Sequence, residues 1–326
     1  MAMIPQGATW VRFPRFVGDA VMQMPVLRFL RLVESGPIVV WGPRTTVELV
    51  ENSDLCDVVL CEDNKPSAFQ MASVLRQYAP TRSIHFPKSL RTPLAAWLAG
   101  VPERIGVDES LAGYFNTVSG PFWKTDGPFV LRYHAVLRQL WPDAPSMPYA
   151  AYAPNAKIDV PPRPYIVFVP GSTWKSKCWP VQHFRELLLL LRSEGLDVVI
   201  LGAQNEYALG EQIAKEEAQN LCGKTTLKEA ASWLKHSQAC IGNDSGLSHL
   251  AGAIGIPTLT LYGATDPLGS LPWGPKSHAI NKPGVPCAPC FKSKCFVDVH
   301  PCMTRIQPME VFKMLKDRLE TSHGLV

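Results

Sequence analysis

Seven prolines in the middle of the chain limit its possible folds more than any other feature. They are Pro142, Pro145, Pro148, Pro154, Pro161, Pro162 and Pro164. Proline fixes φ and has no backbone N–H, so this stretch cannot form a helix or a central strand. We therefore predict a linker here, with one domain over residues 1–155 and a second over residues 156–326. The last helix of the second domain is a candidate for packing back on the first.

Short apolar strands alternate with helices on both sides of this linker. The predicted strands begin near residue 11 and continue at 37–41, 58–61, 83–86, 165–169, 197–201, 239–241 and 258–262. Such alternation is typical of parallel sheets built from βα units. The predicted fold class is therefore α/β, with two Rossmann-like, doubly wound domains facing each other across a cleft. Ligands are expected at the carboxyl ends of the strands.

The net charge and the length of the apolar stretches argue against a nucleic-acid-binding protein and against a protein that spans the membrane. The formal net charge of +4 is too small to indicate nucleic-acid binding, although it suits an acidic substrate or an anionic membrane surface. The longest uncharged apolar stretch, residues 250–265, contains Pro257 and is shorter than the roughly 18–20 residues of a membrane span. The N-terminus lacks the pattern of a secretory signal. We expect a cytoplasmic protein.

The first segment that suggests chemistry is 12–20, where a strand leads through a glycine turn into a helix. Gly18 permits a tight turn, and Asp19 would lie in the first turn of the helix, near the positive end of its dipole. One interpretation is a structural carboxylate at a helix N-terminus. The other is a general base that deprotonates a hydroxyl group. Position alone favours neither.

The loop 170–180 follows the first strand of the second half and suits a diphosphate. Its glycine, the hydroxyls of Ser172 and Thr173 and the ammonium group of Lys177 can all donate to phosphate oxygens. An ordinary βα loop with surface lysines is the alternative.

Segment 241–251 lies at another strand-to-helix junction. Asn243, Asp244 and Ser245 are good N-cap residues, and the exposed N–H groups of such a helix start can bind an anion. His249 follows Ser245 by one helical turn and lies on the same face. Capping accounts for Asp244 and Ser245 but not for His249, which is either structural or a ligand contact.

Two nucleotide-binding motifs are absent. Residues 223–225, Gly-Lys-Thr, are not a P-loop because Ala218 stands where that motif needs glycine. Thr226 and Glu229 instead fit a capping box for the next helix. No Gly-x-Gly-x-x-Gly occurs, which argues against a nicotinamide or flavin cofactor.

Four of the nine cysteines crowd into one segment, with His300 nearby: Cys287, Cys290, Cys295 and Cys302. Thiolates at short spacings suit a structural zinc ion, and disulfides are a further alternative. Reduced thiols in a proline-rich loop are the favoured interpretation for an intracellular chain.

The segments described above, in this order, resemble glycosyltransferase family 9, the heptosyltransferases. The resemblance rests on Val-Gly-Asp at 17–19, Pro-Gly-Ser-Thr at 170–173 with Lys-x-Trp-Pro at 177–180, Asn-Asp-Ser-Gly-Leu-x-His at 243–249 and Tyr-Gly-Ala-Thr-Asp-Pro at 262–267. Residues 86–89 and 98–106 look closest to the ADP-heptose:lipopolysaccharide heptosyltransferase II branch. The similarity covers nearly the whole chain and implies the GT-B architecture.

The resemblance also implies roles for individual residues. Asp19 matches the catalytic base of the family. Donor-binding positions, from the diphosphate to the ribose, adenosine and sugar, are Ser172, Thr173, Lys177, Glu206, Thr225, Asn243, Asp244, Ser245, Gly246 and His249. Lys88 and Arg91 are expected to meet anionic groups of the acceptor. The chain departs from the family pattern at two places. Cys178 stands directly before Trp-Pro, and Arg15-Phe16 stands before the Gly-Asp turn.

The expected reaction is an inverting transfer of heptose from ADP-heptose to heptosyl-Kdo-lipid A in the lipopolysaccharide inner core. No cofactor is expected to be required, because Lys177 and backbone N–H groups would stabilise the departing diphosphate, and the absence of an Asp-x-Asp triplet agrees with this; Mg²⁺ is allowed as a stimulant. A lipid-linked acceptor implies peripheral contact with the inner face of the cytoplasmic membrane, and no nucleic-acid partner is expected. Alternatives are a transferase for another nucleotide-activated sugar, a GT-B nucleotide-sugar epimerase, and a scaffold without activity.

Overall fold

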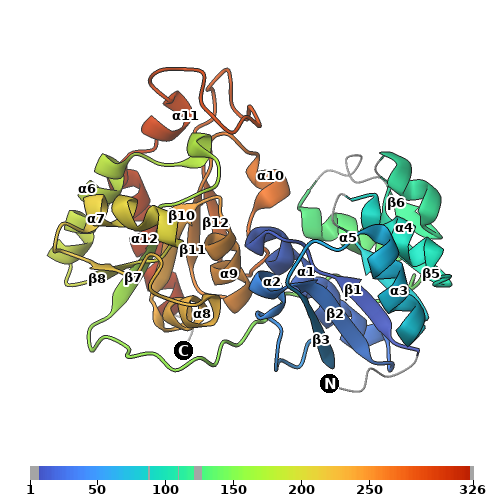
Figure 1. Ribbon diagram of the computed structural model, residues 1–326. Coiled ribbons are helices and arrows are strands. Elements are labelled where there is room, and N and C mark those ends of the chain that lie inside the picture. Colours follow the sequence, from blue (N-terminus) through green and yellow to red (C-terminus); the bar gives the residue numbers. More distant parts are fainter. Residues whose placement is uncertain (1–6, 87–88, 109, 121–126, 324–326) are drawn as a thin grey trace. The chain divides into compact units, whose positions relative to one another are not determined.

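The chain was analysed as a computed structural model that describes residues 7–86, 89–108, 110–120 and 127–323. It forms two compact units, Met1–Ala150 and Ala151–Val326 (Figure 1). The units divide after Ala150, and the predicted domain boundary lies at residue 155. Both positions fall in the segment without helix or strand that precedes β7, which begins at Tyr165.

The first unit contains a six-stranded parallel sheet in the order β3-β2-β1-β4-β5-β6. Its strands are β1 (Thr9–Arg12), β2 (Ile38–Pro43), β3 (Val58–Glu62), β4 (Arg82–His85), β5 (Glu103–Val107) and β6 (Val118–Gly120). Its helices are α1 (Val17–Val33), α2 (Arg44–Val47), α3 (Ala68–Tyr78), α4 (Arg91–Leu98), η1 (Ser110–Phe115) and α5 (Phe129–Leu137). The strand order reverses between β1 and β4, so the loops after these two strands flank the switch point where such sheets bind ligands.

The second unit repeats this topology with the order β12-β11-β10-β7-β8-β9. Its strands are β7 (Tyr165–Val169), β8 (Asp197–Ile200), β9 (Gln219–Asn220), β10 (Ala239–Asn243), β11 (Thr258–Leu261) and β12 (Ser277–Ile280). Its helices are η2 (Lys175–Lys177), α6 (Val181–Ser193), η3 (Gln204–Glu206), α7 (Tyr207–Ala214), α8 (Leu227–His236), α9 (Gly246–Ile254), α10 (Pro267–Ser270), α11 (Pro301–Thr304) and α12 (Pro308–His323). Here the switch point lies between β7 and β10.

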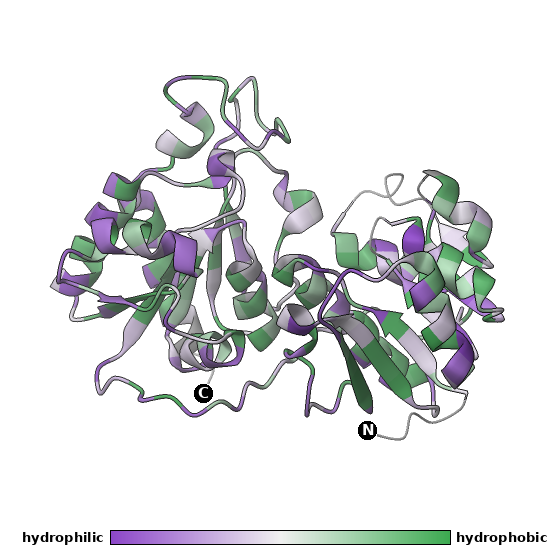
Figure 2. Cartoon of the chain, viewed as in Figure 1, coloured by the Kyte–Doolittle hydropathy of each residue, from purple (hydrophilic) through white to green (hydrophobic). Residues whose placement is uncertain are grey.

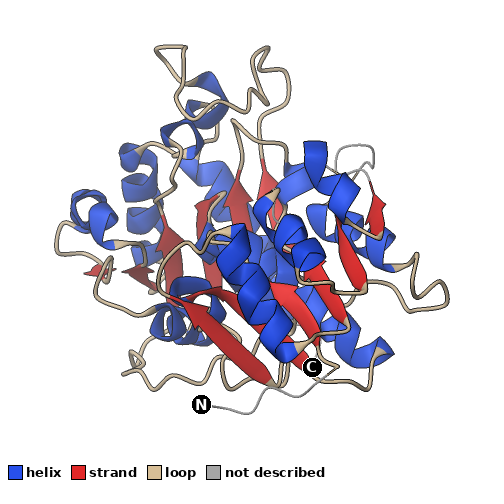
Figure 3. Cartoon of the chain, turned by 45° about the vertical axis from the view of Figure 1, so that its right-hand side comes forward, coloured by secondary structure: helices blue, strands red, loops and turns tan. Residues whose placement is uncertain are grey.

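Apolar strands covered by amphipathic helices form the core of each unit. β1 and β7 are buried along their whole length, as expected for strands of a parallel sheet with helices on both faces. Figure 2 shows the hydrophobic colouring of the β1–β3 strands, and Figure 3 shows helices in front of and behind the strands. The predicted α/β class with Rossmann-like halves is confirmed.

The last helix, α12, packs on α6 within the second unit. Val311 and Leu315 are fully buried there, and Lys316 forms an ion pair with Glu194 at 3.0 Å. Packing of this helix on the first domain stays a prediction. Among the described residues, no helix combines the length and apolarity needed to cross a bilayer.

Candidate functional site

Three polar segments meet at the carboxyl edge of the second sheet. They are the loop after β7, the Asn243–Ser245 turn after β10 and the segment after β11 that contains Thr265. Because β7, β10 and β11 are neighbouring parallel strands, their carboxyl ends lie side by side, and so do these segments. The sheet thereby gathers residues that are about 70 positions apart in sequence.

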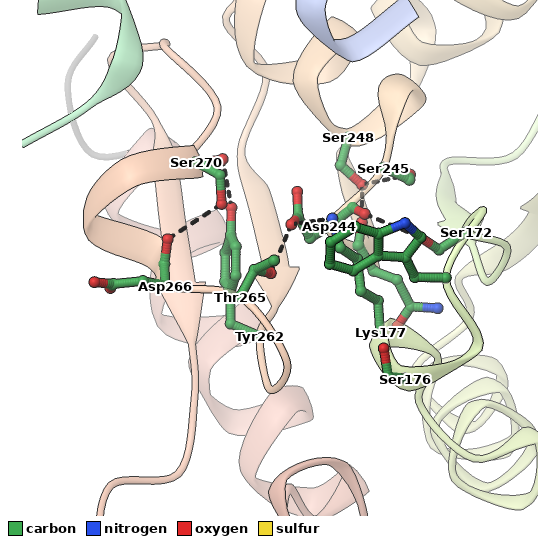
Figure 4. Close-up of polar contacts among 12 residues, drawn as sticks. Ser172, Ser176, Lys177, Asp244, Ser245, Ser248, Tyr262, Thr265, Asp266 and Ser270 are labelled. Atoms are coloured by element: carbon green, nitrogen blue, oxygen red, sulfur yellow. Dashed lines mark hydrogen bonds and ion pairs between the residues drawn. The ribbon is translucent and has the colours of Figure 1, made fainter. Parts of the chain in front are cut away.

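Asp244 is the centre of this group (Figure 4). Its Oδ2 accepts hydrogen bonds from Lys177 Nζ at 2.8 Å and from Thr265 Oγ1 at 2.7 Å. His249 Nε2 lies 3.6 Å from Asp244 Oδ1. The Asp244 side chain is only 5% exposed and that of Lys177 17%, so water screens the pair weakly.

The Asp244 carboxyl group remains ionised despite this burial. Burial alone raises its pKa, but the adjacent His249 ring and the charge of Lys177 outweigh burial and hold the pKa well below the ordinary value of 3.8. The site therefore contains a fixed negative charge that orients a lysine and a histidine. Asp244 positions these donors, and its own contact with the nucleotide sugar stays a prediction.

This depressed pKa predicts how stability depends on pH. A carboxyl group with a lowered pKa in the folded state stabilises the fold above its unfolded pKa, and this contribution is lost as the pH falls. We expect the unfolding free energy to decrease from about pH 5 downward, and Asp244→Asn to show a shallower decrease. Urea unfolding of both proteins across this pH range measures the difference. Parallel curves would contradict the assignment.

The start of α9 supplies further hydrogen-bond donors. Ser245 occupies the N-cap, yet its side chain makes no capping hydrogen bond and lies 3.4 Å from the Ser248 hydroxyl. Ser248 Oγ donates to the Asn243 carbonyl at 2.7 Å, and Ser172 Oγ donates to the Asp244 carbonyl at 3.2 Å. The first backbone N–H groups of this nine-residue helix are therefore not capped by Ser245, and together with the dipole they suit an anion.

The His249 ring lies within this site. It is 4% exposed, and its Nδ1 is shielded from water without a hydrogen-bond partner in the described part of the chain. A buried ring nitrogen normally has a partner, so this geometry is consistent with the predicted ligand contact.

Asn243 has a structural role beside the donor contact that was predicted for it. Its side chain is fully buried, with Nδ2 donating to the Pro170 carbonyl at 2.6 Å and Oδ1 accepting from the Trp179 N–H at 3.0 Å. Both polar atoms are thus bonded to the backbone on either side of the 170–180 loop. Asn243 therefore holds that loop in place, and its contact with the donor stays a prediction.

Glu206 lies beside this site, after β8. Its Oε2 accepts from the Ala203 N–H at 2.8 Å, and a Cβ atom on Gly171 or Gly202 would collide with its carboxylate. Two glycines therefore make room for Glu206 next to the loop after β7.

Thr225 is half-buried and immediately precedes α8. Its neighbour Thr226 forms the predicted capping box with Glu229, in which each side chain bonds to the other's backbone N–H. Thr173, predicted at the diphosphate, is exposed in the loop after β7.

The remaining predicted residues lie in the first unit. Asp19 is in the first turn of α1, as predicted, and is exposed. Its charge acts on Tyr133 of α5: burial, and secondarily this carboxylate, raises the pKa of the Tyr133 hydroxyl. Arg91 begins α4, whereas Lys88 is outside the described residues.

The cysteines are free thiols. Cys302 is buried under Gly263, and burial, together with the neighbouring thiols, raises its pKa to about 11. In the described part of the chain, no three His, Cys, Asp or Glu side chains converge as metal ligands. A structural zinc ion remains an unfavoured prediction.

Sequence reasoning missed two residues of the site, Thr265 and Ser248. Thr265 belongs to the 262–267 motif named above, but it was not listed as a site residue. It follows β11, the neighbour of β10, and this position could have predicted that it lies beside Asp244. Ser248 lies between the singled-out Ser245 and His249, and only the geometry reveals its bond to Asn243.

One family model matches most of this chain, and several named relatives belong with it. Residues 68–300 match the family described as glycosyltransferase family 9 (heptosyltransferase). Lipopolysaccharide heptosyltransferase 1 of Pseudomonas aeruginosa is 30% identical over 254 residues, covering 69% of this chain and 70% of that protein. Lipooligosaccharide heptosyltransferase 2 of Campylobacter jejuni is 23% identical over 96% of this chain and 99% of its own length.

Solved structures extend the similarity to the fold. The E. coli ADP-heptose LPS heptosyltransferase II superposes with a TM-score of 0.76 at 24% identity, covering 97% of this chain and 99% of that one. A family 9 glycosyltransferase from Veillonella parvula superposes with a TM-score of 0.78 at 21% identity, covering 98% and 99%. These likenesses confirm the predicted GT-B fold class.

Proposed function

The chain belongs to glycosyltransferase family 9, the heptosyltransferases, and on this premise we propose that it transfers heptose from ADP-heptose to heptosyl-Kdo-lipid A of the lipopolysaccharide inner core. Its relatives are named for lipopolysaccharide or lipooligosaccharide heptosyl transfer. The acceptor would be lipid-linked, and we place the enzyme in the cytoplasm, in peripheral contact with the inner face of the membrane.

The observation that carries the proposal is the group of donors at the carboxyl edge of the second sheet. Lys177 and the N-terminus of α9 present an ammonium group and backbone N–H groups to one small region. The Lys177 ammonium group has three N–H donors, so it can keep its bond to Asp244 and still donate to a phosphate oxygen. A nucleoside diphosphate is the ligand that this arrangement fits best.

In the proposed reaction the acceptor hydroxyl attacks the anomeric carbon on the face opposite ADP, in a single inverting displacement. Asp19 accepts the hydroxyl proton as the new bond forms. The departing diphosphate gains negative charge, which Lys177 and the α9 N–H groups stabilise. Glu206 and Thr225 are assigned to the ribose and the adenosine end. In this scheme the protein's own donors supply the charge stabilisation, with Mg²⁺ as an optional stimulant.

A panel of nucleotide sugars tests the donor assignment. A ligand that binds the folded state raises stability by about 2.7 kcal/mol at 100 times its Kd. We expect ADP-heptose to raise Tm more than UDP-, GDP- or CDP-sugars at equal concentration. A larger shift with another nucleotide would reject ADP as the carrier. Conversion of the donor in the absence of acceptor would indicate an epimerase instead.

A further inference from the structure

A segment without helix or strand, residues 291–300, is bonded to the loop after β7. It lies between β12 and α11 and belongs to the cysteine-rich stretch whose role the proposed function leaves open. Its partner in the loop is Ser176, the central residue of η2, which is 1% exposed. We call residues 291–300 the bracing segment.

The backbone and the side chain of Ser176 both bond to the bracing segment. The Ser176 N–H donates to the Ser293 carbonyl at 3.3 Å, and its hydroxyl donates to the Lys292 carbonyl. His300 Nε2 lies 2.8 Å from the Ser176 carbonyl oxygen, and because a carbonyl can only accept, this ring nitrogen carries the hydrogen. Polar groups of a buried residue need partners, and the bracing segment supplies one for each polar group of Ser176.

These bonds fix the place from which Lys177 acts. η2 is a three-residue turn without a capping side-chain hydrogen bond, and a turn this short depends on outside contacts for its geometry. Lys177 directly follows Ser176, and its ammonium group bonds to Asp244 at 2.8 Å (Figure 4). A displacement of the Ser176 backbone would therefore displace Lys177 as well.

The bracing segment also holds the neighbour of a second donor to Asp244. The Phe291 N–H donates to the Ala264 carbonyl at 2.8 Å. Ala264 directly precedes Thr265, whose hydroxyl donates to Asp244 Oδ2. One segment is thus bonded to the residues next to both donors of this carboxylate oxygen.

The backbone of His300 is left-handed, with φ +43° and ψ +57°. This conformation is costly for a residue with a side chain, and a residue held in it despite the cost points to a function. The ring is half-buried and reaches a residue 124 positions earlier in the chain. Its hydrogen bond is the contact of the bracing segment that a substitution can remove without changing the loop itself.

We propose that Ser176 and His300 are positioning residues for the nucleotide diphosphate: through them the bracing segment holds Lys177 where its ammonium group meets a phosphate. The inference rests on the proposed function, which assigns Lys177 to the diphosphate. A loop that is ordered before binding loses less freedom when the ligand binds, so the brace strengthens binding without touching the ligand.

ADP titration of His300→Leu and His300→Gln tests the brace. Leucine removes the ring N–H, whereas the glutamine amide can donate from nearly the same place as Nε2. We expect the ADP affinity to fall roughly 3- to 10-fold in His300→Leu, the factor that corresponds to one hydrogen bond, and to recover in His300→Gln. Both variants keep a side chain on the same left-handed backbone, so their comparison isolates the hydrogen bond. The acceptor KM should stay at the wild-type value in both.

His236→Leu is the matched control. His236, in the last turn of α8, has its Nδ1 2.8 Å from the Ser232 carbonyl oxygen, which is the same kind of bond in the same unit. A merely structural role of His300 would lower Tm in His300→Leu and in His236→Leu alike, with no change in ADP affinity at a temperature where both are folded. Equal ADP affinity in the wild type and in both leucine variants would overturn the proposal.

Hydrogen exchange without any ligand separates failure of the brace from failure of the proposed function. The amides of Ser176 and Lys177 should exchange faster in His300→Leu than in the wild type, and at the wild-type rate in His300→Gln and His236→Leu. Unchanged exchange in His300→Leu would overturn the brace even if ADP binds. Faster exchange in His300→Leu with no ADP binding by the wild type would support the brace of Lys177 and reject the donor assigned to it.

Discussion

Asp19→Asn should reduce heptosyl transfer by about 10²- to 10⁴-fold, the contribution typical of a general base, while leaving ADP binding unchanged. Asparagine preserves the size of the side chain and its place in the first turn of α1, but it cannot take up the acceptor proton. Single-turnover transfer rates and ADP titration measure the two quantities separately. The acidic limb of the wild-type pH–rate profile should also disappear in the variant.

The competing interpretation of Asp19 is electrostatic support of the helix N-terminus. In that case Asp19→Asn would cost about 0.3–1 kcal/mol of stability, with little change in turnover. Asp63→Asn is the matched control, since Asp63 is an exposed carboxylate of the same unit that lies 3.6 Å from Arg44. Equal turnover in the wild type and in Asp19→Asn would reject the assigned base.

Lys177→Met should weaken ADP binding roughly 10- to 100-fold, the effect of removing one charge-assisted hydrogen bond to a phosphate. It should also lower stability, because the Asp244 carboxylate stays buried without its ammonium partner. Isothermal titration with ADP and urea unfolding measure the two effects. Lys175→Met is the control, since Lys175 is exposed in the same loop and should affect neither quantity.

A double variant separates the two consequences of losing Lys177. In Lys177→Met/Asp244→Asn the uncompensated buried charge is gone, so much of the stability should return while ADP binding stays weak. Recovery of ADP binding in the double variant would show that Lys177 acts only by neutralising Asp244. The phosphate contact assigned to Lys177 would then be withdrawn.

The sequence predicted the central strands well because each is a short run of buried apolar residues. Tyr165–Val169 and Ile38–Pro43 are of this kind. The strands that were not predicted lie toward the edges of the sheets, where fewer strand residues are apolar and buried. The edge strand Ser277–Ile280 contains a serine and a histidine, and Gln219–Asn220 has only two polar residues. Such strands are defined by pairing with a neighbour, which no local pattern reveals.

Most of the residues that meet in the candidate site were named from the sequence, but the contacts between them were not. The motif around Asp244 and the loop with Lys177 were recognised separately, and only the neighbouring strands β7 and β10 bring them into a 2.8 Å ion pair. Asn243 was predicted to be a donor contact together with its neighbours Asp244 and Ser245. Its two bonds to the 170–180 backbone connect it to residues more than 60 positions away, beyond the reach of local sequence reasoning.

Of the arginines near the N-terminus that could contact an anionic membrane surface, three form ion pairs within the first unit. Arg28 pairs with Asp54 at 2.7 Å, and Arg31 pairs with Asp57 at 2.9 Å. Arg12 is buried against Glu62. Arg15 is exposed and stays a candidate for membrane contact.

A crystal structure of the ADP complex tests the central assignment most directly. It should place the β-phosphate within about 3 Å of Lys177 Nζ and of the first N–H groups of α9, the range of charge-assisted hydrogen bonds. Lys177 should keep its bond to Asp244 in that complex. A diphosphate bound away from the β7 and β10 loops would contradict the account.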